Sequence, residues 1–176
     1  MPSRDSKTRK FVLAAVLCGV ALALSLADTM LSSAVAFLPG LKLGLANIVS
    51  LYALMTLGLP YAMLIVLARS LLAALFSGNL TMLFFSAAGG AVSLLVMCLL
   101  LRALSVIKVS VMGGVTHNLM QVLVAVFITS TPQAAYYLPV LAAAGAVSGF
   151  FMGVLCKLLL RKAHLYYSAI KNPQGF

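Results

Sequence analysis

Three adjacent polar residues, and a fourth one helical turn later, stand inside an otherwise apolar segment. They are Thr116, His117, Asn118 and Gln121. Each unpaired polar group in hydrocarbon costs several kcal/mol, so these side chains should face a protein interior or a cavity. His117 and Gln121 are four residues apart and share one helix face, with Asn118 beside them. We expect the cluster either to hydrogen-bond a ligand or to join neighbouring helices, and His117 would make one of these hydrogen bonds pH-dependent.

Arg69 is the costliest residue in the chain to bury. It stands about nine residues into an apolar segment, hence ~14 Å deep at 1.5 Å per residue. It needs a partner or a water-filled pocket. One alternative is a structural pair with Asp28, the only acidic residue in an apolar segment. The other is an anionic ligand, with Lys42 as a second positive group at the outer mouth, because guanidinium geometry suits phosphate or carboxylate.

Asn47 adds a further polar point, five residues after Lys42 in an apolar segment. The side chains that could bind a small molecule are Lys42, Asn47, Arg69, His117, Asn118 and Gln121. No second His or Cys stands near His117, so we expect no metal site.

The composition indicates an integral membrane protein. Of the 176 residues, 64% are hydrophobic and 8% are charged, whereas soluble domains carry roughly 25% charged residues. The length leaves room for about six spans of ~20 residues. We therefore expect one membrane domain and a location in the bacterial cytoplasmic membrane.

The net charge of +10 reflects topology rather than a nucleic-acid partner. If the N-terminus is cytoplasmic, ten of the twelve basic residues fall on the cytoplasmic side. That distribution follows the positive-inside rule, so both termini are predicted to be cytoplasmic. The first apolar segment is interpreted as a retained signal-anchor rather than a cleaved signal peptide.

The residues for catalysis are missing. Two acidic residues cannot supply the Asp-rich, magnesium-binding motifs of prenyl transfer, and the sequence has no P-loop or catalytic triad. We expect no enzymatic activity and no cofactor.

Apolar segments and their Gly/Pro breaks predict six transmembrane helices. The expected ranges are 11–31, 43–57, 61–76, 80–101, 109–128 and 138–160, the fourth interrupted by Gly89-Gly90. This all-α membrane domain would cover residues 11–162, between a basic cytoplasmic N-terminus (1–10) and a cytoplasmic C-terminal tail (163–176).

Small residues recur at four-residue spacing in two of these helices. The first stripe comprises Ala15, Gly19, Ala23 and Ala27, and the second comprises Gly145, Gly149 and Gly153. Small residues let another helix approach closely. Each stripe is therefore expected either to pack inside the bundle or to dock a separate membrane partner.

Two sequence blocks carry a family resemblance, LPGLKLGLANIV at 38–49 and GxxHNxxQ at 114–121. Together with Arg69, Gly78 and the GGxxS stretch at 89–93, they resemble the Gx transporter family, also labelled heptaprenyl diphosphate synthase component I. The resemblance extends over nearly the whole chain, from the first predicted helix through the sixth.

The resemblance implies an architecture and partners. The family looks similar to the S components of energy-coupling-factor vitamin transporters, six-helix proteins that bind a small molecule near the outer face. Those proteins dock through small residues of their first helix onto a transmembrane coupling subunit driven by two ATPases. By this resemblance the chain is an S-component-like bundle, and the docking residues are Ala15, Gly19, Ala23 and Ala27.

Two functions follow as alternatives. The first is uptake of a small, anionic molecule, such as a vitamin, a flavin or an isoprenoid or quinone precursor. The second is a non-catalytic membrane accessory subunit of a heptaprenyl diphosphate synthase or of a quinone-linked redox assembly. In either case, membrane lipid surrounds the chain.

Overall fold

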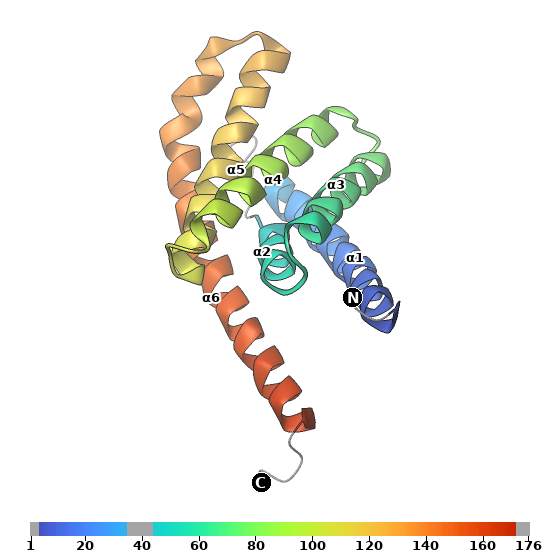
Figure 1. Cartoon of the computed structure of the whole chain (residues 1–176). Coiled ribbons are helices and arrows are strands. Elements are labelled where there is room, and N and C mark those ends of the chain that lie inside the picture. Colours follow the sequence, from blue (N-terminus) through green and yellow to red (C-terminus); the bar gives the residue numbers. More distant parts are fainter. Residues whose placement is uncertain (1–3, 35–43, 172–176) are drawn as a thin grey trace.

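The computed structural model describes residues 4–34 and 44–171, and every regular element in these ranges is a helix (Figure 1). The elements in chain order are α1 (Arg4–Ala34), α2 (Ala46–Leu57), α3 (Leu59–Phe76), α4 (Thr81–Leu100), α5 (Val106–Thr129), the 3-10 helix η1 (Pro132–Tyr137) and α6 (Leu138–Lys171). The predicted all-α class is confirmed.

Five of the six described α-helices, all except α2, are long and apolar enough to cross a membrane. The apolar helix α2 has 12 residues, which span ~18 Å against a hydrocarbon core of ~30 Å. The chain is therefore a multi-pass membrane protein. The count of six spans, the cytoplasmic location of both termini and the domain limits stay predictions.

Two helices run further than the sequence predicts. Helix α1 begins at Arg4, inside the basic N-terminal stretch, and α6 continues to Lys171. Hydropathy detects only the part of a helix that lies in hydrocarbon, whereas Lys and Arg are themselves good helix formers and extend it. The predicted interruption at Gly89-Gly90 is wrong, because α4 runs without a break from Thr81 to Leu100.

The break between α2 and α3 depends on Gly58. Its φ of 89° lies in the left-handed region that favours glycine. The Gly58 amide donates to the Ala53 carbonyl at 3.2 Å, and Pro60 stands in the first turn of α3. The predicted tight break at this position is confirmed.

The helices pack in pairs around a shared core. Helix α5 packs against α4 and, most extensively, against α6, while α3 joins α1 to α4. The short α2 lies between α1 and α6, which do not contact each other within the described residues (Figure 1). The buried apolar core includes Leu51, Ile65, Leu94 and Val109, which are contributed by α2, α3, α4 and α5.

A buried polar layer as candidate functional site

Arg69 lies inside the helix bundle, where its side chain is 2% exposed. Its Nη1 donates to Ser25 Oγ of α1 at 3.3 Å. Its Nε and Nη2 are buried and have no hydrogen-bond partner among the described residues. A buried donor without a partner costs about 1–3 kcal/mol, and more when it is charged. Nε and Nη2 form the side edge of the guanidinium, which holds a carboxylate or phosphate with two parallel hydrogen bonds.

Gly90 of α4 gives the guanidinium its space. A Cβ at position 90 would lie 3.3 Å from Arg69 Nη2 and 2.6 Å from Val66 Cγ1. The second distance is a clash, so a side chain here would force α3 and α4 apart. The glycine pair that failed to interrupt α4 instead permits close packing beside Arg69.

Asp28 of α1 is also buried, at 4% exposure. Its Oδ2 accepts a hydrogen bond of 3.0 Å from the Gly44 amide, just before α2 begins. The carboxylate attracts the Arg69 guanidinium electrostatically. The Arg69 side chain, however, makes its hydrogen bond to Ser25. Asp28 thus ties α1 to the start of α2 and supplies negative charge near Arg69.

Three of the four polar residues of the α5 cluster are buried as predicted, with His117, Asn118 and Gln121 each at most 9% exposed. The prediction is wrong for Thr116, which is half-buried and donates within its own helix. A Cβ at Gly89 would lie 3.1 Å from His117 Nδ1. Since Gly90 is the neighbour of Arg69, the glycine pair of α4 stands between Arg69 and His117. The structure therefore brings these two predicted binding residues to the same level of α4.

The other predicted binding residues lie in separate surroundings. Asn118 Nδ2 donates to the Leu141 carbonyl at 2.8 Å and so joins α5 to α6. Asn47 is half-buried in the first turn of α2, with its Nδ2 3.3 Å from the position of a Cβ at Gly44. The Gln121 side chain has no hydrogen-bond partner in the part of the chain that the structure describes. Lys42 lies outside the described residues.

Sequence reasoning missed two hydroxyl groups of this layer. Ser25 accepts the hydrogen bond of Arg69, and Ser70 donates to Ser86 Oγ at 3.0 Å. Ser25 stands three residues before Asp28 and therefore shares its helix face. That spacing, and the position of Ser70 next to Arg69, are signals that could have found both. Ser93 likewise joins helices, by donating to the Gly113 carbonyl at 2.8 Å.

The two small-residue stripes lie in opposite environments. Gly145, Gly149 and Gly153 are buried against α5, and a Cβ at Gly149 would lie 2.6 Å from the Ser110 carbonyl oxygen. On α1, Ala15, Gly19 and Ala23 are exposed and Ala27 is half-buried. A Cβ at Gly19 would meet no atom within 4 Å. The α6 stripe therefore packs inside the bundle, as one of the two alternatives predicts.

Fold and site together define a class of protein, a multi-pass helical membrane protein with a buried arginine and further buried polar side chains between its helices. A model of the family described as heptaprenyl diphosphate synthase component I matches residues 17–159, and the chain belongs to this family. The predicted family resemblance is confirmed. No curated protein and no solved structure matches the chain.

Proposed function

We propose that the chain is the substrate-binding membrane subunit of an uptake system and that its substrate is a small anionic molecule. The observation that carries this proposal is the buried Nε/Nη2 edge of Arg69, which has no partner among the described residues. A carboxylate or phosphate on this edge would satisfy both donors and compensate the buried charge. An uncharged substrate would add no negative charge to that of Asp28.

Each predicted binding residue has a role in this proposal. Arg69 neutralises the substrate, with Lys42 as a second positive group. His117 approaches from the other side of the glycine pair of α4, and Gln121 offers an amide without a partner among the described residues. Asn47 and Asn118 orient the substrate, and Asn118 also holds α6 through Leu141.

The exposed stripe of α1 supports a docking role. Its small side chains form a smooth outward face, and the open space at Gly19 admits a close helix. We propose that a transmembrane coupling subunit, driven by two ATPases, docks on Ala15, Gly19, Ala23 and Ala27. In this arrangement the chain binds and releases its substrate and does no covalent chemistry.

Affinity purification from native membranes in mild detergent tests the proposal. Mass spectrometry would identify both co-purifying proteins and bound small molecules. A coupling subunit with ATPases, or a retained anionic compound, is the expected result. The amount of compound that co-purifies with Arg69→Gln should be at least tenfold lower than with the unchanged protein. Arg102→Gln, which removes an exposed arginine, should retain the full amount. If Arg69→Gln retains the compound at a lower protein yield, Arg69 has a structural role instead.

A second candidate rests on the name of the family. Under it, the chain is a non-catalytic membrane accessory subunit that holds a heptaprenyl diphosphate synthase at the membrane. The same purification separates the two candidates. A soluble prenyl synthase without ATPases, together with no retained small molecule, would favour the accessory subunit.

A further inference from the structure

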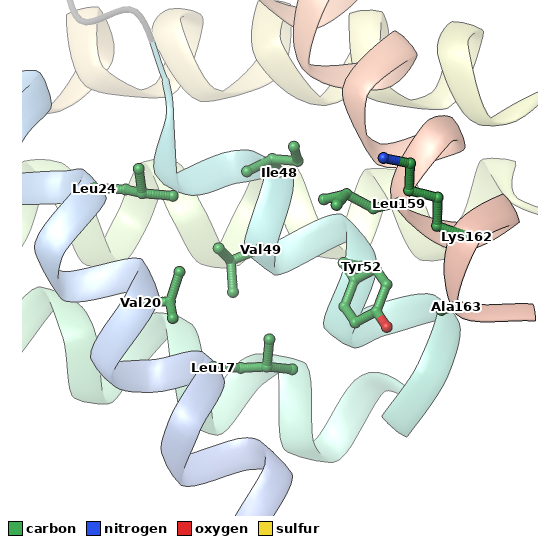
Figure 2. A pocket seen from close by; sticks show the side chains of 9 residues that line it. All are labelled: Leu17, Val20, Leu24, Ile48, Val49, Tyr52, Leu159, Lys162 and Ala163. Carbon is green, nitrogen blue, oxygen red and sulfur yellow. The ribbon is translucent and has the colours of Figure 1, made fainter. Parts of the chain in front are cut away.

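A groove of ≈ 560 Å³ runs between α1, α2 and α6, and Arg69 is not among the residues that line it (Figure 2). Leu17, Val20 and Leu24 of α1 form one wall, Tyr52 belongs to α2, and Leu159 and Lys162 of α6 stand opposite. Apart from Lys162 and the Tyr52 hydroxyl, the side chains around it are hydrocarbon. It is therefore an apolar groove with a cation in its lining.

The groove faces sideways, toward the surroundings of the bundle. Its outer walls are α1 and α6, which do not contact each other within the described residues. Wall residues are partly open, with Val20 45% and Leu159 48% exposed. In a multi-pass membrane protein, such an opening faces the bilayer.

The basic end of the groove lies at a membrane interface. Lys162 is the penultimate residue of the apolar span Ala135–Ala163, and the α1 span begins at Lys7. The N-terminal end of α1 and the C-terminal end of α6 lie at the same side of the molecule (Figure 1). Lipid phosphates lie at this level, and an exposed lysine there attracts them.

Lys162 has no ion pair among the described residues, and the chain offers few groups to make one. Its only acidic residues are Asp5 and Asp28, and Asp28 accepts a hydrogen bond from Gly44 within the bundle. Among the described residues, the Lys162 ammonium is therefore available to an external anion.

We propose that this groove binds one anionic phospholipid of the surrounding bilayer. The hydrocarbon chain of the lipid lies against Leu17, Val20 and Tyr52, and the lipid phosphate contacts the Lys162 ammonium. The site is separate from the Arg69 layer and does not depend on the proposed uptake function. It would hold the lipid between the two helices that the bundle leaves apart.

Native mass spectrometry of delipidated, detergent-purified protein tests the site, with phosphatidylglycerol and phosphatidylcholine added separately. We expect one tightly held phosphatidylglycerol per chain. Lys162→Gln should weaken its binding about fivefold. Lys157→Gln is the matched control, because Lys157 is an exposed lysine of the same helix that does not line the groove.

A bulky side chain placed in the groove tests whether the hydrocarbon chain of the lipid lies there. Val20→Trp should reduce binding of both lipids at least tenfold, whereas Val16→Trp, one turn away and outside the groove, should not change it. Should Val20→Trp fail to fold, Leu159→Trp blocks the groove from the opposite wall.

Three results would overturn the proposal. Equal retention of both lipids by every variant would mean unspecific lipid contact. Inorganic phosphate that displaces no lipid but binds in a Lys162-dependent way would assign the lysine to a soluble anion. Loss of a co-purifying membrane protein, rather than of lipid, in Val20→Trp would make the groove a protein interface.

Discussion

Helices α1 and α6 both have a stripe of small residues at four-residue spacing, but the α6 stripe is buried and the α1 stripe is largely exposed. On α6 the stripe is buried, and a Cβ at Gly145 would lie 2.6 Å from the Gly114 carbonyl oxygen. On α1 a Cβ at Gly19 would meet nothing within 4 Å. Small residues permit close approach, but a facing backbone must be present to use it.

The difference originates in what lies opposite each stripe. Helix α5 presents Gly114 to Gly145, so both backbones approach without a side chain between them. The buried face of α1 is a different one, formed by Ala14, Ala21 and Asp28 at seven-residue spacing. Its stripe consequently faces outward, which is the property that the proposed docking of a partner requires.

Gly149→Leu should have the largest effect of the changes that test this comparison. A Cβ at position 149 would lie 2.6 Å from the Ser110 carbonyl oxygen and 2.8 Å from Val111 Cα. Both are backbone atoms and cannot turn aside, so α5 and α6 must separate. We expect a loss of about 3 kcal/mol in the free energy of unfolding, measured by denaturant titration in detergent.

Gly19→Leu is the matched control for this change. It makes the same substitution in the other stripe, where space is open. The unfolding free energy should stay the same or rise by up to about 1 kcal/mol, because leucine is the better helix former. Equal destabilisation by the two variants would contradict the distinction between an internal and an outward stripe.

Asn118→Leu should have an intermediate effect at the α5–α6 contact. It removes the 2.8 Å hydrogen bond from the Asn118 amide to the Leu141 carbonyl, at a similar side-chain volume. We expect a loss of about 1 kcal/mol, since hydrogen bonds between membrane helices contribute ~0.6 to 2 kcal/mol. Thermal unfolding in the same detergent measures it.

The control for this variant is Thr116→Val on the same helix. The Thr116 hydroxyl is exposed and donates within its own helix, to the Met112 carbonyl at 2.7 Å. Its removal should change stability by less than about 0.5 kcal/mol. If Asn118→Leu costs no more than this control, the bond to α6 does not stabilise the bundle.

Much of the fold could be predicted from the sequence, because burial in hydrocarbon imposes strong constraints. Long apolar segments predicted the helices that are long enough to span a membrane, and Gly58-Leu59-Pro60 predicted the break between α2 and α3. Helix ends were less predictable. The basic end segments of α1 and α6 are helical because their residues have high helix propensity, which a hydropathy pattern does not detect.

The candidate site was only partly predictable. The cost of a buried charge identified Arg69, and its burial is confirmed. Its partner Ser25 lies 44 residues earlier in the chain, and only its spacing from Asp28 marks it in the sequence. The helix that faces a small-residue stripe decides whether the stripe is internal. The spacing of residues within one helix does not identify that facing helix.

Ala23→Leu should have the smallest effect on the chain itself and the most specific effect on its assembly. Ala23 is exposed on the outward face of α1, so a larger apolar side chain meets lipid or a partner rather than the bundle. The unfolding free energy should change by less than about 0.5 kcal/mol. Co-purification of a coupling subunit should be lost, because leucine keeps the partner helix at a distance.

The unfolding free energy and the co-purification of Ala23→Leu together decide what the α1 stripe contacts. Unchanged folding together with lost co-purification would assign the α1 stripe to a partner, in contrast to the α6 stripe. Unchanged co-purification would show that the stripe contacts lipid and that the partner docks elsewhere. A stability loss as large as that of Gly149→Leu would instead place the α1 stripe in an internal contact, and the comparison between the two helices would fail.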